Sequence, residues 1–378
     1  MTKEQNRDNI RQSRKFTRRR FIQMAATSLL VAGCTPVQEL VAPTEAPTAA
    51  PTTAPTAVPT ATPPPTAVPT AAPTPAPAKP DIIQTYPNVP SKVVHTRHSG
   101  VWQDDDLDGT AIRQMLDASI AELTGLDDAA EAWAALFDPR DRIAIKVNTI
   151  RLSAFWTHVP LVMAVTECLQ EIGVPPEQIV IFDRLTSEME RAGFPINQDE
   201  AGIRCHGTDF KYVEGWTLMG KEIGLSEILT DCTALINMPI LKENLNGGIT
   251  FAMKNHYGAF DKPQEFHAPQ IDQAIAELNA LEPIQERTRL IIGDALKIAQ
   301  GTAHGWTIAR TGNSIFMSFD PIAHDTVGLQ WLSEVWTADG DDPTMAIELA
   351  TPWLENGAKL GLGTNEPENM ELIEIALT

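Results

Sequence analysis

From about residue 90 onward, short apolar runs alternate with amphipathic segments, and this alternation limits the chain to few folds. Apolar runs of strand length occur at 92–96, 142–148, 178–182, 234–238, 289–293, 315–319 and 371–376. Helical spacing of apolar residues occurs at 109–123, 160–172, 269–281 and 344–360, and Pro321 suits the first position of a further helix. Such alternation is typical of a mostly parallel sheet covered by helices on both faces. We therefore expect an α/β fold, built either as one large core or as two closely joined lobes.

The N-terminus indicates export. Residues 17–23, TRRRFIQ, have the layout of a twin-arginine signal, and the apolar stretch 24–31 is too short to span a bilayer. Small residues then precede Cys34, as they do at the cleavage site of a lipoprotein signal peptidase. We predict that residues 1–33 are a signal peptide and that lipidated Cys34 anchors the protein to the outer face of the cytoplasmic membrane. The alternative is a basic tail before an ordinary helix.

A linker of unusual composition separates this signal from the rest of the chain. Residues 34–80 are almost wholly Pro, Thr, Ala and Val, a composition that cannot bury a core. We predict a disordered spacer there and a single α/β domain over residues 81–378. The formal net charge is −20 although the first 33 residues are basic, which argues against nucleic acid as a partner. Protein partners cannot be inferred from the sequence.

The remaining cysteines and the known short motifs exclude several classes of site. Cys168, Cys205 and Cys232 have no CxxC spacing, so the sequence lacks iron–sulfur and zinc-ribbon motifs, and one disulfide of undetermined pairing is compatible with it. The absence of GxSxG, Walker and GxGxxG patterns leaves serine hydrolase, P-loop and dinucleotide sites without support. The run 104–109 resembles a calcium loop, but its twelfth position is Met115, so we expect a solvated loop and a helix cap.

Polar residues follow several of the expected strands. Lys146 and Asn148 close one strand, Asp183 closes the next, Lys242 follows another, and Asp294 ends a fourth. In open parallel sheets, ligands bind beyond the carboxyl ends of the strands. The sequence therefore predicts that these side chains line one cleft.

The densest group of polar residues lies in the segment 237–260. Gly247 and Gly248 precede an expected helix or tight turn at 247–256, where backbone N–H groups could bind an anion. Lys254, Asn255 and His256 then follow one another. Lysine supplies charge, asparagine supplies a donor and an acceptor, and histidine serves as an acid–base group or metal ligand.

These segments resemble the DUF362 family, a set of prokaryotic proteins without an assigned function. The resemblance rests on IAIKVN up to Asn148, NMPILKENLNGGITFAMKNHYG (237–258), RLIIGDAL (289–296), SFDPIAHD (318–325) and AKLGLGTNEPENMELIEIAL (358–377). It spans about residues 90 to 377 and implies a fold more than a reaction. Some members carry an added ferredoxin module, which this sequence lacks, so the resemblance implies no iron–sulfur cluster here.

Two functional hypotheses follow. In the first, the domain binds or converts a small anionic ligand: Lys146 and Lys254 hold an oxyanion, His256 moves a proton, and Asn148, Lys242, Asn255, Gly247, Gly248, Asp183 and Asp294 bind the ligand. A divalent metal held by His256 with Asp183 or Asp294 is a variant, and the cofactor is otherwise unknown. In the second, the protein is a non-catalytic solute-binding or assembly protein of the cell envelope. Lys146 could instead form a structural pair with Asp183 or Asp294, and Asp320 is expected to cap the helix at Pro321.

Overall fold

The computed structural model describes residues 11–14, 77–150, 155–199, 201–302 and 305–378. The predicted signal peptide and linker lie almost wholly outside the described residues, as does Cys34. None of the helices in the described ranges combines the length and apolarity that crossing a bilayer requires.

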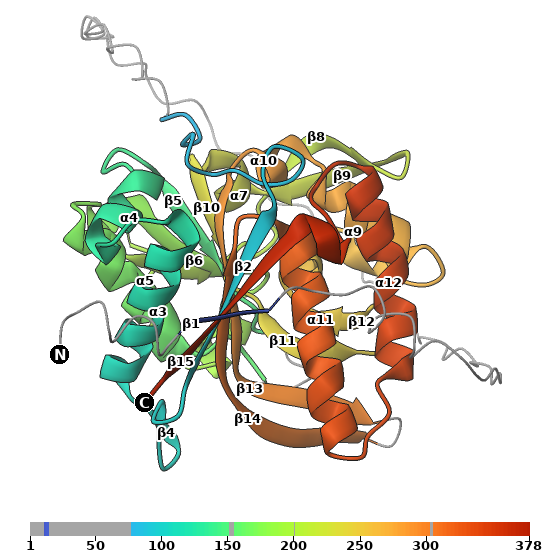
Figure 1. The fold of residues 1–378 in the computed structure, drawn as a ribbon. Helices are drawn as coiled ribbons and strands as arrows, with labels where there is room; N and C mark the ends of the chain where they lie inside the picture. Colours follow the sequence, from blue (N-terminus) through green and yellow to red (C-terminus); the bar gives the residue numbers. More distant parts are fainter. Residues whose placement is uncertain (1–10, 15–76, 151–154, 200, 303–304) are drawn as a thin grey trace, which may run out of the picture. The chain divides into compact units, whose positions relative to one another are not determined.

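A mixed, mostly parallel sheet forms the centre of the domain (Figure 1). Its main order is β1 (Arg11–Arg14), β15 (Met370–Leu377), β2 (Ser91–His98), β14 (Gly305–Ser318), β13 (Thr288–Thr302), β10 (Ala234–Asn237), β5 (Ile143–Lys146), β6 (Ile179–Asp183) and β7 (Arg204–Gly207). The pairs from β13 through β10, β5 and β6 to β7 are parallel, and so is β15 with β2. β14 runs antiparallel to both β2 and β13, and β1 runs antiparallel to β15.

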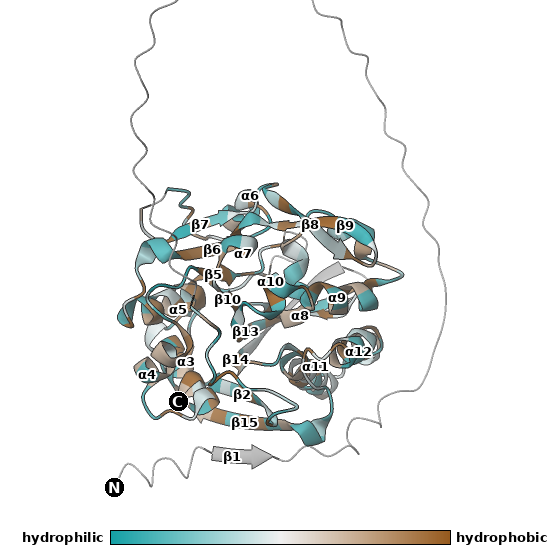
Figure 2. Cartoon of the chain, turned by 90° about the horizontal axis from the view of Figure 1, so that it is seen from above, coloured by the Kyte–Doolittle hydropathy of each residue, from teal (hydrophilic) through white to brown (hydrophobic). Residues whose placement is uncertain are grey.

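Helices cover both faces of this sheet, so the predicted fold class is confirmed. One face carries α3 (Gly109–Thr124), α4 (Ala129–Leu136) and α5 (Val159–Glu171); the other carries α9 (Ile271–Asn279), α11 (Pro321–Ala338) and α12 (Thr344–Lys359). Figure 2 shows the strands from β7 to β15 running between these two groups. Shorter helices are α6 (Thr186–Arg191), α7 (Glu227–Asp231), α8 (Ala252–Asn255) and α10 (Glu282–Gln285).

The two faces have separate hydrophobic cores because side chains alternate along each strand. In β5, Ile143 and Ile145 pack into the core beside α3, α4 and α5, whereas Ala144 packs into the opposite core. Lys146 follows Ala144 by two residues and therefore starts from the face that α9, α11 and α12 cover. The side chain of Lys146 therefore begins at the edge of the hydrophobic core that these three helices cover.

Several small elements were not predicted from the sequence. They are β3 (Trp102–Gln103), β4 (Asp106–Leu107), the β8–β9 hairpin (Tyr212–Leu218 and Lys221–Ser226), and the pair β11 (Ile240–Asn244) and β12 (Gly248–Thr250). The segment 247–256, expected as a helix or tight turn, begins with β12 and only then forms α8. At Gly248, φ is +76° and an added Cβ would lie 2.2 Å from the Ala346 carbonyl oxygen, so glycine lets this strand approach α12.

Three cysteines are buried as free thiols, and two aspartates cap helices as the sequence predicts. Cys168, Cys205 and Cys232 are buried free thiols, and burial raises the pKa of each to about 12. Asp108 caps α3 by accepting from the Ala111 N–H at 2.8 Å, in agreement with the loop-and-cap interpretation of the run 104–109. Asp320 caps α11 by accepting from the Ile322 and Ala323 N–H groups, as expected.

Asp320 should make the free energy of unfolding depend on pH. Its fully buried carboxylate also accepts from the Thr364 N–H and the Ser91 hydroxyl, yet burial raises its pKa to about 6. The folded protein therefore binds this proton more tightly than the unfolded chain. The contribution of Asp320 to stability should fall as pH rises from about 4 to about 6, by on the order of 2–3 kcal/mol.

Urea denaturation of the wild type and of Asp320→Asn, at a series of pH values from 4 to 7, measures the pH-dependent contribution of Asp320 to the free energy of unfolding. Asparagine removes the titration, so the difference between the two proteins should change across this range whatever the absolute loss of stability. A difference that stays constant with pH would contradict the assignment.

Candidate functional site

A buried polar cluster lies at the carboxyl ends of three adjacent parallel strands. Lys146 is the last residue of β5, Asp183 the last of β6 and Asn237 the last of β10. These strands are hydrogen-bonded neighbours running in the same direction, so their final residues meet at one edge of the sheet. The predicted convergence of strand endings is present for Lys146 and Asp183, and Asn237 joins them.

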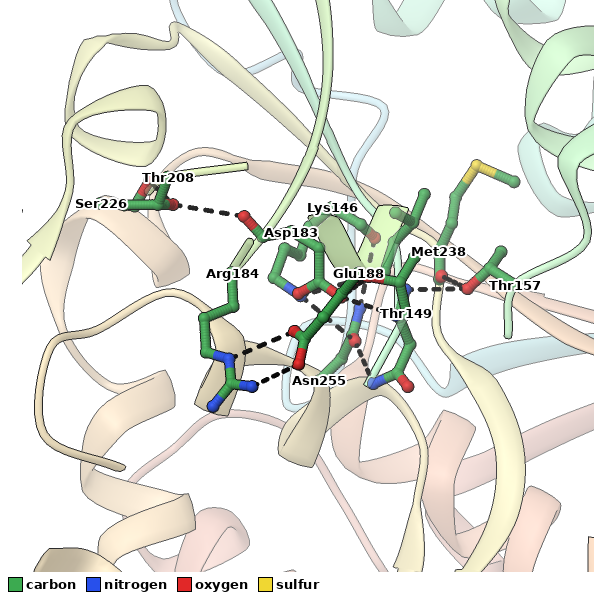
Figure 3. Close-up of polar contacts among 12 residues, drawn as sticks. Lys146, Thr149, Thr157, Asp183, Arg184, Glu188, Thr208, Ser226, Met238 and Asn255 are labelled. Carbon is green, nitrogen blue, oxygen red and sulfur yellow. Dashed lines mark hydrogen bonds and ion pairs between the residues drawn. The ribbon is translucent and has the colours of Figure 1, made fainter. Parts of the chain in front are cut away.

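Lys146 and Asp183 form a buried ion pair at the centre of the cluster (Figure 3). The Lys146 Nζ donates to Asp183 Oδ1 at 2.7 Å and to the Val147 carbonyl at 2.7 Å. Asp183 Oδ2 accepts from the Thr149 N–H at 2.6 Å and from the Thr149 hydroxyl at 2.8 Å. Gly258 permits this packing, because an added Cβ would lie 2.4 Å from Asp183 Oδ1. Burial lowers the pKa of Lys146, and the adjacent carboxylate opposes that shift.

Asparagine side chains hold the surrounding backbone in place. Asn255 donates to the Lys146 carbonyl at 3.2 Å and to Asn237 Oδ1 at 2.7 Å, while its own Oδ1 accepts from Asn148 Nδ2 at 3.0 Å. Asn237 in turn donates to the Ala252 carbonyl at 2.9 Å. Each amide is therefore fixed in orientation, and the short helix α8 is tied to the ends of β5 and β10.

Lys242 joins the cluster from β11. Its Nζ donates to Asn148 Oδ1 at 2.8 Å and to the Phe155 carbonyl at 3.1 Å, and its side chain is buried. Burial lowers the pKa of Lys242 to about 7; the Asp183 carboxylate opposes this shift, and the charges of Lys146 and Lys254 add to it. Lys242 is therefore close enough to each of the other two lysines for their charges to affect it.

Lys254 lies on α8 in a different environment. Its Nζ sits 4.0 Å from the centroid of the Tyr257 ring, and its aliphatic part lies against Gly247, where an added Cβ would come within 3.1 Å. Among the described residues, its ammonium makes no hydrogen bond or ion pair. Burial alone lowers the pKa of Lys254 to about 7. This amine is the least compensated buried charge among the predicted site residues.

His256 has a defined tautomer. Asn279 Nδ2 donates to the Met253 and Ile275 carbonyls, both at 2.8 Å, so Asn279 Oδ1 must accept from His256 Nδ1 at 2.7 Å. The proton therefore lies on Nδ1 and the lone pair on Nε2. Nε2 is buried and has no hydrogen-bond partner in the described chain. Burial lowers the pKa of His256 to about 4, which keeps the ring neutral at neutral pH.

Three predicted positions are wrong: Asp294 lies within β13 rather than at the end of a strand, and Gly247 and Gly248 precede no helix directly. Asp294 is buried, but its Oδ2 accepts from the backbone N–H and the ring Nδ1 of His158, each at 2.7 Å, rather than from a lysine. The Gly247 N–H donates to Asn244 Oδ1 at 2.9 Å, and Gly248 lies in β12 rather than before a helix. The expected anion-binding turn with free N–H groups is therefore not formed.

The predicted metal variant finds no support in the arrangement of these groups. In the parts of the chain that the structure describes, no three His, Cys, Asp or Glu side chains are grouped so that they could hold a metal ion. His256 faces Asn279, Asp183 faces Lys146, and Asp294 faces His158, so the three proposed ligands have separate partners.

Three members of the network were not singled out from the sequence. Asn237, Thr149 and Asn279 orient Asn255, Asp183 and His256 respectively. Asn237 could have been found, because it ends an apolar strand inside the motif 237–258. Thr149 and Asn279 have no comparable signal, since one lies in a loop and the other on an ordinary helical face.

The fold and this site define an α/β protein with a lysine–asparagine–aspartate cluster at the carboxyl edge of its parallel strands. Residues 143–330 match the family model described as "Domain of unknown function (DUF362)", so this part of the chain is similar to that family. The match covers all the predicted site residues of the cluster. No sequence among the curated proteins matches the chain.

Two solved structures are similar to the chain at low identity. A crystal structure of a Thermotoga maritima protein shares 12% identity and a TM-score of 0.36, over 68% of this chain and 60% of that one. The lactate racemase apoprotein from Thermoanaerobacterium thermosaccharolyticum shares 10% identity and a TM-score of 0.39, over 64% of this chain and 57% of that one. The chain thus spans less than two thirds of the length of either protein.

The Lys146–Asp183 pair should be strongly coupled. Removing one partner leaves the other charge buried, so Lys146→Met and Asp183→Asn should each cost about 3–5 kcal/mol of unfolding free energy. The double variant should cost clearly less than the sum of the two, because neither charge remains. Urea denaturation of the four proteins gives the coupling energy.

The surface pair Lys221–Glu265 is a matched control. Its atoms are 3.1 Å apart, but both side chains are more than half exposed, so its coupling energy should be below about 1 kcal/mol. The predicted strong coupling would be contradicted if the two single substitutions had additive effects on the free energy of unfolding. A coupling energy no larger than that of the surface pair would contradict it too.

Proposed function

We propose that this domain binds a small anion at the lysine cluster, and that the cluster can take part in proton transfer to or from it. The observation that carries the proposal is Lys254, a buried ammonium without a carboxylate partner among the described residues. A buried charge is costly unless it is paired or loses its proton. An anionic ligand would supply the missing partner.

The electrostatics of the neighbouring residues support the same conclusion. Lys242 lies close enough to Lys254 for charge repulsion, while Asp183 already pairs with Lys146. Carboxylate and phosphate-type oxygens are the ligands that lysine ammonium groups bind most readily. Since the lysines are almost completely buried, the ligand would have to be small.

The cluster also contains groups that could exchange protons with such a ligand. The neutral His256 has an unpartnered lone pair on Nε2, and Lys254 has a pKa near 7. A general base or acid works best when its pKa lies near the working pH. This combination favours catalytic conversion of the ligand over binding alone.

Substitution of Lys254 should weaken anion binding. Sulfate and acetate are suitable probes, because neither titrates between pH 6 and pH 9. Isothermal calorimetry on the full-length protein should show at least tenfold weaker binding for Lys254→Met, which removes the charge and keeps most of the side-chain volume. Affinity should also fall as pH rises above 7, by up to about tenfold per pH unit, because the ammonium form is lost.

Lys359 provides the control variant, since its side chain is 69% exposed at the end of α12. Lys359→Met should bind both probes as the wild type does. Equal binding by the Lys254→Met and wild-type proteins, or an affinity that does not change between pH 6 and pH 9, would contradict the proposal.

We further propose that the protein acts outside the cytoplasm as a membrane-tethered lipoprotein. Support comes from the sequence alone: a twin-arginine layout, a short apolar stretch and Cys34 occur in the required order. Fractionation of cells that express the full-length chain tests this. The wild type should pellet with membranes, and Cys34→Ser should be released from them; an unchanged distribution would contradict the tether.

A further inference from the structure

His158 and Asp294 form an oriented pair outside the lysine cluster. The fully buried Asp294 accepts two bonds from His158 at Oδ2, one from the backbone N–H and one from ring Nδ1, both at 2.7 Å. Its other oxygen accepts from the Leu296 N–H at 3.1 Å. The carboxylate therefore fixes the ring orientation and keeps a proton on Nδ1. Nε2 is left with the ring's lone pair.

A cavity of about 500 Å³ lies against this histidine. Its walls come from the segment 155–160, at the start of α5, together with Ala192, Gly193 and Lys297. The His158 side chain is 18% exposed, so the ring is reachable although its carboxylate partner is not. Within the described chain, Nε2 makes no hydrogen bond. A buried carboxylate thus orients an imidazole in the wall of an open cavity.

Lys297 and Trp156 also line this cavity. The Lys297 Nζ lies 4.1 Å from the centroid of the Trp102 ring, and that ring also packs edge-on against His158, with 5.6 Å between centroids. Lys297 has no acidic partner among the described residues. The Trp156 indole N–H is buried and also lacks a hydrogen-bond partner there. The remaining walls are aromatic or aliphatic, from residues such as Phe155 and Pro160.

We propose that this cavity is a second ligand site, for a small organic anion with an apolar body. Lys297 pairs with the anionic group, and the apolar walls contact the body of the ligand. His158, positioned by Asp294, exchanges a hydrogen bond or a proton with the ligand through Nε2. A cavity with apolar walls and a few convergent polar groups is the usual form of a small-molecule site.

This site uses different charged groups from the lysine cluster, although Phe155 contacts both. The segment between them has separate contacts on each side: the Phe155 carbonyl accepts from Lys242, whereas His158 binds Asp294. The Thr157 hydroxyl donates to the Met238 carbonyl at 2.9 Å and fixes the segment between the two. Failure of anion binding at Lys254 would therefore leave this proposal standing, and the reverse also holds.

Protection from chemical modification tests ligand binding. Diethyl pyrocarbonate acylates accessible unprotonated imidazole nitrogen, and peptide mass spectrometry reports the modification of His158 in the full-length protein. Benzoate should protect His158 in a saturable way, and its neutral counterpart benzyl alcohol should protect much less. In Lys297→Met the benzoate concentration needed for half-protection should rise at least tenfold. Lys211→Met, which changes a lysine in the wall of a different cavity, should behave as the wild type does.

The proposal is overturned if benzoate fails to protect His158. It is also overturned if Lys297→Met is protected at the same concentrations as the wild type. The role of Asp294 has its own readout in the ¹⁵N shifts of the His158 ring. The wild type should keep Nδ1 protonated, and Asp294→Asn should lose this preference while remaining folded by circular dichroism; a folded variant with unchanged shifts would refute the positioning role.

Discussion

Burying lysine amines at the end of a parallel sheet is the physical constraint on which this structure depends. A buried ammonium needs an anionic partner or must release its proton, and the protein uses both solutions side by side. Lys146 has Asp183 at 2.7 Å, whereas Lys254 rests on an aromatic face with a pKa near 7. Lys146 therefore has its charge balanced by Asp183, whereas Lys254 has no carboxylate partner among the described residues, and this difference is the basis of the proposed anion site.

The topology of the sheet explains why such amines can be held there. β10, β5 and β6 run in the same direction, so their last residues gather at one edge, and helices close the faces on both sides. Asparagine amides then tie α8 to the strand ends, with each donor and acceptor of Asn255 engaged. The cluster is therefore held in position by the protein's own hydrogen bonds.

Much of the fold could be predicted because strand and helix periods differ clearly along this chain. The long helices and most strands lie near their expected ranges, but β13 and β14 are far longer than the expected 289–293 and 315–319, and β7 was not expected. Strand endings located Lys146, Asn148 and Asp183 correctly at one edge. The position of Asp294 could not be predicted in the same way. The sequence places it after an apolar strand, but β13 continues through it to Thr302, and tertiary packing brings His158 beside it, 136 residues away in the chain. The β11–β12 pair was missed because its short strands depend on contacts with α12 rather than on local pattern.

The protonation of Lys254 is the most direct test of the account. A pH titration of the lysine ¹³Cε resonances, with Lys254 assigned by its loss in Lys254→Met, measures the pKa of this amine in the full-length protein. The account predicts a pKa near 7 in the absence of anions and a clear upward shift in saturating sulfate. An ordinary pKa near 10.5 that does not respond to sulfate would contradict it.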